Sequence, residues 1–273
     1  MSQPLFSTRT VLAFTLLVAV GAGCVALGLW QLDRAAERRA TAATIAQGRS
    51  ANALNLNATT VTPRALANWT PAAVQGHWRS EYSVLLDNRN LEGRPGLWLA
   101  TPLVMADGRA ILVLRGWFAR PIGDKKAPVV STPQELQDLK GELSEHVPRL
   151  FELWSSNKQS ELSFGTQQAT GQSHLTSNKP LDVDQRSPSA VDTATLPRMQ
   201  NLTLVELEKR SGLTLLPVVL LQTSPTNDAL IRIWPEPSVD ADKNVGYAMQ
   251  WFGFATICLI ALIVFGWRAR RRG

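Results

Sequence analysis

The chain has 273 residues, 45% of them hydrophobic, and a formal net charge of +6 at pH 7 from 28 basic and 22 acidic residues. Five of the basic residues lie in the first nine and the last six positions, which leaves 23 basic against 22 acidic residues between them. The basic excess is therefore confined to the termini and gives no reason to expect nucleic-acid binding. Both cysteines, Cys24 and Cys258, lie in long apolar segments, so the region between these segments has no disulfide and must be held by its own core.

The first predicted element is a membrane-spanning helix over residues 10–30. These 21 residues carry no charge. As a helix with a rise of ~1.5 Å per residue they would be about 31 Å long, enough to cross a bilayer. The alternative is a signal peptide, or a lipoprotein signal that ends at Cys24, but a cleaved signal has a shorter apolar core of roughly 7–15 residues. We therefore favour an uncleaved anchor, whose helix continues through an Ala- and Arg-rich stretch and ends near Gly48.

The middle of the chain predicts a mainly antiparallel β domain. Six short stretches are rich in Leu, Val and aromatic residues and are bounded by Gly, Pro, Asn and Asp, which is typical of strands. They are residues 82–88, 96–104, 110–119, 147–154, 214–222 and 229–234. Asp107 and Gly108, between the second and third stretches, form a hairpin signal. We expect these strands to close into a barrel or a curved sheet, accompanied by short helices.

The first of two short helices is predicted in STPQELQDLKG, residues 131–141. Thr132 would be the N-cap and Pro133 the first helical residue. Glu135 would complete a capping box with Thr132, and Gly141 would end the helix. These signals concern structure and imply no chemistry.

The second short helix is predicted in NLTLVELEKRSG, residues 201–212. Thr203 and Glu206 form a capping box, and Leu202 is placed to pack against Leu207. The basic pair that follows suits the C-terminal end of a helix dipole, and Gly212 would end the helix.

Residues 155–195 differ in composition from the sequence around them. Of these 41 residues, 18 are Ser, Thr or Gln, and the apolar residues are too sparse to form a face. Burial of so little apolar surface cannot offset the entropy lost on ordering, so we predict a disordered loop inserted into the domain.

A second membrane-spanning helix is predicted over residues 247–267, another run of 21 uncharged residues. Basic residues in the tails 1–9 and 268–273 predict that both termini are cytoplasmic and that residues 31–246 lie on the other side of the membrane. The N-terminal tail is too short and too poor in arginine for a mitochondrial transit peptide. We therefore expect a bacterial inner-membrane protein with a periplasmic domain.

The sequence carries no common motif of an enzyme. It has no His-Glu-x-x-His, Gly-x-Ser-x-Gly, Walker or Cys-x-x-Cys motif. His77, His146 and His174 have no spacing that suggests a shared metal, and His174 falls in the predicted loop. We expect neither catalysis nor a metal site.

Polar and aromatic residues at the edges of the two spans are the remaining candidates for function. Gln31 and Arg34 follow the first span three residues apart, on one face of the helix. Tyr247, Gln250 and Trp251 share a face at the start of the second span, which we expect to meet the first span near Trp30 and Gln31. An interfacial belt of aromatic residues with an anchoring arginine would explain most of this set. Gln250 is harder to explain, because an amide inside a span needs a partner, either in the other span or in a bound cofactor or protein.

These stretches resemble the Surfeit locus protein 1 family, the assembly factors of haem-copper cytochrome oxidases. That family pairs a first span ending in Gly-x-Trp-Gln-x-x-Arg with a second span opening on Tyr-x-x-x-Trp, and it carries an Arg-Gly-Trp strand between them. The matching residues are Gly28, Trp30, Gln31, Arg34, Tyr247 and Trp251 for the spans, Arg115, Gly116 and Trp117 for the strand, and Asn88, Arg89, Gly96, Thr101 and Pro102 in a further stretch. The resemblance covers both ends and most of the middle, without residues 155–195.

The resemblance implies a non-enzymatic factor that helps to place haem a in oxidase subunit I, with subunit I and a haem-a synthase as candidate partners. The edge residues described above, Trp30, Gln31, Arg34, Tyr247, Gln250 and Trp251, are then a candidate site for haem or a partner. Two positions depart from the family: Leu114 stands where relatives commonly have asparagine, and Asn244 stands where haem-binding relatives have histidine. An amide is a poor iron ligand beside imidazole, so any haem contact is expected to be transient. A membrane-tethered periplasmic hydrolase and a structural scaffold of the cell envelope are the alternatives.

Overall fold

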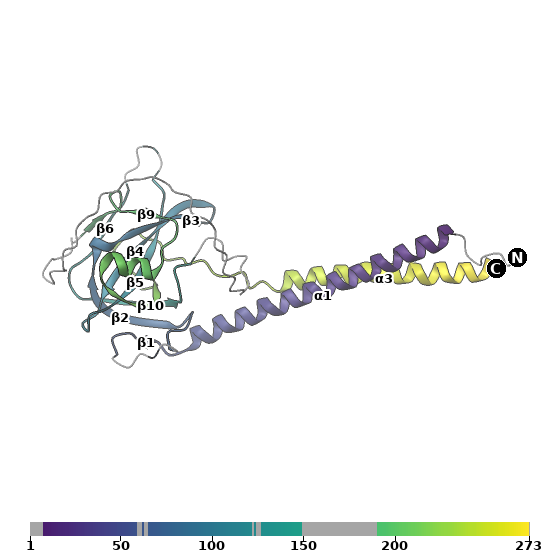
Figure 1. Cartoon of the computed structure of the whole chain (residues 1–273), viewed down its shortest axis with the longest axis horizontal. Coiled ribbons are helices and arrows are strands. Elements are labelled where there is room, and N and C mark those ends of the chain that lie inside the picture. The colour runs from purple at the N-terminus through teal and green to yellow at the C-terminus, as the bar shows by residue number, and fades with distance from the viewer. Residues whose placement is uncertain are drawn as a thin grey trace. The chain divides into compact units, whose positions relative to one another are not determined.

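The structure, a computed structural model, describes residues 8–58, 62, 65–121, 123, 127–148 and 190–272. It divides into two compact units (Figure 1). One contains residues 1–46 and 236–273, and the other contains residues 47–235.

Two long helices make up the first unit. Helix α1 is Thr8–Ser50 and helix α3 is Asp242–Arg272. Both are long and apolar enough to cross a membrane, over Val11–Ser50 and Asp242–Arg268. The two predicted apolar helices are thus confirmed, and α1 ends close to its predicted end near Gly48. The helices run antiparallel, because Gln31 contacts Asn244 whereas Gly21 lies beside Cys258 (Figure 1).

The second unit is built around a closed, barrel-like sheet (Figure 1). The sheet order is β1-β2-β7-β10-β5-β4-β3-β9, and an additional pairing of β2 with β4 closes it. The strands are β1 Leu54–Asn55, β2 Pro71–Trp78, β3 Val84–Leu91, β4 Arg94–Val104, β5 Arg109–Ala119, β7 Gln137–Ser144, β9 Arg198–Met199 and β10 Thr214–Gln222. Within the closed ring only β5 and β10 are parallel, so the prediction of a mainly antiparallel barrel is confirmed.

Four shorter elements accompany the barrel. Strands β6, Val129–Ser131, and β8, Ala190–Asp192, form a separate antiparallel pair. Helix α2 is Leu204–Ser211, and a short 3-10 helix, η2, covers Ser80–Tyr82.

Hydrophobic residues cover both faces of the central strand β5. Ile111 and Val113 pack into one cluster with residues of β2, β4, β7 and β10, whereas Leu112 and Leu114 pack into a second cluster that includes Leu207 of α2. Successive side chains of a strand point to opposite faces, so one cluster fills the barrel and the other lies between its wall and α2. Strand β5 is therefore held from both sides, which gives the Arg-Gly-Trp residues at its end a rigid support.

Several local predictions are confirmed. Residues of the second, third and fifth predicted stretches form β4, β5 and β10, and most of the first lies in β3. Gly108 has a φ of +84° in the turn between β4 and β5, as the hairpin signal requires. Helix α2 is capped by Thr203, whose hydroxyl accepts a bond from the Glu206 N–H at 3.2 Å, and by Gly212, which has a φ of +69°.

The short helix predicted for residues 131–141 is wrong, because these residues lead into strand β7. Leu139, Gly141 and Leu143 are buried and alternate with more exposed residues, which is the period of a strand. Thr132 caps no helix, since its hydroxyl accepts a bond from Arg115. Pairing of β7 with both β2 and β10 overrides the local capping signal.

Two further predictions are corrected or left partly untested. The predicted strand 229–234 is wrong, because only Ile231 pairs, in a single bridge with Trp117. In the predicted loop 155–195, the described residues 190–195 are ordered and contain β8, with Thr193 fully buried. The rest of this loop, and most of the predicted strand 147–154, lie outside the described residues.

Candidate functional site

The contact between α1 and α3 has the spacing of a coiled coil. Buried and half-buried positions of α1 recur at alternating intervals of four and three residues. They are positions 17, 21, 24, 28, 31, 35 and 38, and those of α3 include 244, 248, 252, 255 and 258. Such a repeat keeps one face of each helix turned to the other. We call this contact the helix seam.

Small residues of α1 bring the two helices together. A Cβ atom added at Gly28 would lie 2.6 Å from the ring of Phe252, and one added at Gly21 would lie 3.4 Å from the Cβ of Cys258. Gly28 thus leaves room for an aromatic side chain of the other helix. Small residues serve this purpose in helix pairs within membranes. The glycine of the Gly-x-Trp-Gln-x-x-Arg motif, Gly28, is therefore explained by packing.

A hydrogen bond between two amides lies at one end of the helix seam. The Asn244 Nδ2 donates to Gln31 Oε1 at 2.6 Å, and both side chains are partly buried. Close by along α1, Arg38 Nη1 donates to the carbonyl oxygen of Asp240 at 2.8 Å. These bonds fix the register of the two helices, because a shift of one turn would break them. Gln31 therefore finds its partner in Asn244, a pairing that the sequence did not predict.

The face of Tyr247, Gln250 and Trp251 is turned largely away from the helix seam. Tyr247 is 53% exposed and the Gln250 side chain is exposed, whereas Ala248 between them is 1% exposed. Trp251 is half-buried at the edge of the seam and meets Phe254 edge to face at 6.0 Å. The face of α3 that contacts α1 is thus rotated from the expected one. It contains Asn244 and Ala248.

The aromatic and basic residues of the first motif also point outward. Trp30 is 53% exposed. Arg34 forms an ion pair with Glu37 of its own helix at 2.7 Å, and both side chains are well exposed. Their roles in membrane anchoring and in recognition remain predictions.

The polar end of the helix seam does not fit axial ligation of iron. It consists of the amides of Gln31 and Asn244, already bonded to each other, with Arg38 further along α1. None of these is an imidazole, thiolate, thioether or phenolate, the usual axial ligands of haem. Among the described residues, no group of three or more His, Cys, Asp and Glu side chains could hold a metal ion.

The histidines are not brought together by the described structure. His77 lies on β2, where its Nδ1 is 3.0 Å from the carbonyl oxygen of Gln134. His146 follows β7, and its carbonyl oxygen accepts a bond from the Ser144 hydroxyl. His174 lies outside the described residues.

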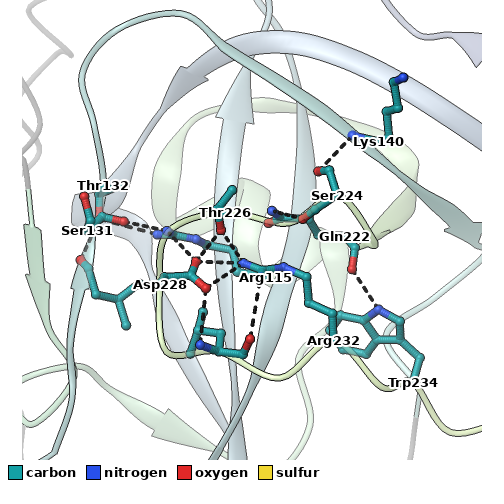
Figure 2. Close-up of polar contacts among 12 residues, drawn as sticks. Arg115, Ser131, Thr132, Lys140, Gln222, Ser224, Thr226, Asp228, Arg232 and Trp234 are labelled. Carbon is teal, nitrogen blue, oxygen red and sulfur yellow. Dashed lines mark hydrogen bonds and ion pairs between the residues drawn. The ribbon is translucent and has the colours of Figure 1, made fainter.

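A second candidate region surrounds Arg115 at the end of β5, within the barrel unit (Figure 2). The Arg115 side chain is 3% exposed, and its Nη2 donates to the carbonyl oxygen of Ser131 at 2.6 Å. Its guanidinium lies 4.6 Å from the ring centroid of Trp78 and 3.8 Å from the carboxylate of Asp228. Burial lowers the pKa of Arg115 to about 10 although Asp228 opposes this, so Arg115 stays cationic at neutral pH.

Asp228 gathers the segment that follows β10 around its buried carboxylate (Figure 2). The carboxylate is 3% exposed and accepts two bonds from Arg232, at 2.7 and 2.8 Å. It also accepts bonds from the Thr226 hydroxyl at 2.6 Å and from the Leu230 N–H at 3.2 Å. These local bonds curl residues 226–232 into a compact loop, which is why the strand predicted there does not form.

Gly116 and Trp117 hold the same loop through the main chain. The Trp117 N–H donates to Ile231 at 2.7 Å, and the Ile231 N–H donates back at 2.8 Å. Gly116 has a φ of +155°, and a Cβ there would lie 2.7 Å from the Cβ of Leu230 and 3.0 Å from the Ile231 carbonyl oxygen. Only glycine lets the loop come this close.

The side chain of Trp117 extends the arrangement to β3, since its Nε1 donates to the carbonyl oxygen of Arg89 at 2.6 Å. On the loop side, Trp234 Nε1 donates to the Gln222 carbonyl oxygen at 3.0 Å and packs edge to face on Trp98 at 5.4 Å. We call Arg115, Gly116 and Trp117 with the loop 226–234 the Arg-Gly-Trp clamp. Each of its three signature residues fastens the chain after β10 to the barrel.

The remaining family positions are also structural. Asn88 has a φ of +58° at an irregularity in β3, and Arg89 is buried over the Trp98 ring at 4.6 Å. Gly96 lies against Trp117, where a side chain would collide with the indole. The hydroxyls of Thr101 and Ser83 lie 2.9 Å apart in the interior. Pro102 lies in strand β4 of the same unit. Leu114, one of the two positions that depart from the family, is fully buried in the core.

Sequence reasoning missed Asp228 and Arg232, which complete the clamp. The only signal for them was their i, i+4 spacing in a stretch that otherwise had the composition of a strand.

Comparison with known proteins agrees with these motifs. The model of the SURF1 family matches residues 18–256, which include the barrel unit, most of α1 and the first half of α3. No curated protein matches the chain.

Proposed function

The chain belongs to the SURF1 family, which implies a role in cytochrome oxidase assembly, and we propose that it assists the placement of haem a in subunit I of a haem-copper oxidase. The observation that supports this most is that the matched residues 18–256 contain the facing parts of both terminal helices, with the Gln31–Asn244 pair, and the complete Arg-Gly-Trp clamp. The proposed action is that of a chaperone without catalytic turnover.

The charge pattern supports a topology for this role. Both basic tails would remain in the cytoplasm, and the barrel unit would lie in the periplasm of a bacterial cell. In that orientation the polar end of the helix seam would lie at the outer face of the inner membrane, where Trp30 and Tyr247 suit the interface. Subunit I is itself a membrane protein, so this edge is where a contact with it is expected.

The Gln31–Asn244 amide pair at the helix seam limits what the protein would contribute to haem binding. Because Asn244 already binds Gln31 and offers no strong ligand, we propose that subunit I supplies the ligands of the iron. The present chain would contribute contacts of other kinds, from Arg34 to a carboxylate and from Trp30, Tyr247 and Trp251 to a flat apolar surface. A haem-a synthase is a further proposed partner.

The proposal is tested first in cells. Deletion of the gene should lower oxidase activity and the haem a content of subunit I, and the full-length protein should restore both. A strain that assembles normal, haem-loaded oxidase without the protein would refute the proposal and would favour an envelope scaffold or a hydrolase.

The second test concerns haem retention. The full-length protein, produced together with haem a and purified in detergent, should contain well under one haem per chain by absorbance. Asn244→His should raise this ratio, whereas Asn244→Gln, which keeps an amide, should leave it low. One tightly held haem in the unmodified protein would show that another ligand exists and would return His77 and His146 to consideration.

A further inference from the structure

Helix α3 presents a second regular stripe on the side opposite the helix seam. Its members recur at alternating intervals of four and three residues, and every one of them is exposed in the single chain. They are Gly246, Gln250, Gly253, Ile257, Ile260 and Val264. We call them the outer stripe of α3. Since α1 covers only the other side of α3, nothing in the described chain packs against the outer stripe.

Gln250 makes this face unsuited to lipid alone. At a rise of ~1.5 Å per residue, it lies about 4.5 Å further into the apolar run than Tyr247. A side-chain amide offers two N–H donors and an acceptor oxygen, and within a membrane it needs partners for them. Gln31 and Asn244 cannot serve, because they are bonded to each other on the opposite side of α3.

The two glycines permit another helix to approach closely. A Cβ added at Gly246 or Gly253 would meet no atom within 4 Å, so the surface beside Gln250 is open on both sides. Glycines one or two turns apart let helix backbones pack together in membranes. Further along the stripe, Ile257 is 63% and Ile260 is 55% exposed, and β-branched residues at such positions suit a paired helix.

We propose that the outer stripe binds the same stripe of a second copy of this chain, with the two Gln250 amides hydrogen-bonded to each other. Two copies inserted in the same orientation are related by an axis normal to the membrane, which places each residue of α3 at the same depth as its counterpart. Gln250 then faces Gln250, and one amide can both donate to and accept from another. An unrelated helix would have to present such a group at this depth by its own sequence. The inference rests on the proposed insertion of α3 into the membrane.

Cysteine cross-linking tests the face that is used. In full-length protein with Cys24→Ala and Cys258→Ala, a single cysteine is introduced by Ile257→Cys on the outer stripe or by Ile263→Cys away from it. The two positions are matched in exposure, at 63% and 62%. Mild oxidation in lipid vesicles should produce a disulfide-linked dimer with Ile257→Cys at least several times faster than with Ile263→Cys. Equal rates, or faster linkage of Ile263→Cys, would overturn the proposal.

The contribution of Gln250 is measured by energy transfer between labelled copies in vesicles, over a range of protein-to-lipid ratios. Gln250→Leu should weaken self-association roughly three- to thirtyfold, the range expected for an interhelical hydrogen bond in a membrane. Gly253→Leu should weaken it as well, whereas Phe254→Leu, off the stripe, should not. Unchanged association of Gln250→Leu would mean that the amide reaches the interface water instead, and it would overturn the proposal.

Oxidase assembly provides an independent readout. If Gln250→Leu lowered assembly while self-association stayed at the unmodified level, the stripe would serve a different protein and the proposal would be wrong. Because self-association is measured without the oxidase, its loss and a failure of the proposed function can be told apart.

Discussion

Substitution of Asp228 by asparagine tests whether the Arg-Gly-Trp clamp holds the loop after β10 through charge. Asn has nearly the same shape, so the change removes the charge with little change in packing. The carboxylate of Asp228 is 3% exposed and lies against two guanidinium groups, of Arg232 at 2.7 Å and of Arg115 at 3.8 Å. Removing one partner from a buried ionic group costs about 3–5 kcal/mol, because the remaining charge stays buried without compensation. For a domain of this size such a loss lowers Tm by roughly 6–20 °C.

Arg115→Met provides the matched control within the same cluster. It removes the second buried guanidinium but leaves Asp228 with Arg232, Thr226 and the Leu230 N–H. Asp228→Asn should therefore lower the free energy of unfolding more than Arg115→Met does.

Both variants are compared with the unmodified full-length protein by tryptophan fluorescence during heating in detergent. The barrel unit contains Trp78, Trp98, Trp117 and Trp234, so its unfolding should dominate the signal. If Asp228→Asn melts within about 2 °C of the unmodified protein, less than 1 kcal/mol at this size, the charged clamp does not stabilise the fold. If Arg115→Met is the more damaging variant, the cation–π and Ser131 contacts of Arg115 outweigh the ion pairs.

Three further predictions follow from individual residues. Gly116→Ala should lower the free energy of unfolding by about 1–3 kcal/mol in denaturant titrations, because its Cβ would lie 2.7 Å from the Cβ of Leu230, whereas Gly123→Ala, with nothing within 4 Å, should cost less despite its positive φ. Arg34→Lys should keep membrane insertion but lower oxidase assembly if Arg34 recognises a carboxylate, while the control Arg39→Lys should leave assembly unchanged. Full assembly in Arg34→Lys would mean that Arg34 is only an anchor. Deletion of residues 155–189 should preserve the melting temperature and oxidase assembly. Extending the deletion through residue 195 should destabilise the protein, because it removes β8 and the fully buried Thr193. A 155–189 deletion variant that fails to fold would contradict this.

The sequence by itself determined the features that depend on local composition. Two uncharged runs of 21 residues predicted α1 and α3, since nothing but a helix satisfies the backbone over such a length of apolar sequence in a membrane. The capping residues of α2, Thr203 and Gly212, were recognisable because they bond within their own turn. The Asp107-Gly108 turn was recognisable for the same reason. The motifs at the span edges and in β5 were sufficient to indicate the family.

Only the tertiary structure decided which partners the polar groups choose. Residues 131–141 carry helix signals, yet pairing with β2 and β10 makes residues 137–141 part of strand β7. Residues 229–234 have the composition of a strand, yet the buried carboxylate of Asp228 curls them into the clamp. At the helix seam, helical spacing gave the periodicity of α3 but not which of its faces turns toward α1. Gln250, which was expected at the contact, faces outward, and Asn244 meets Gln31 instead. A period can be read from one chain alone, whereas a hydrogen-bond partner 213 residues away is chosen by the packing of the whole pair of helices.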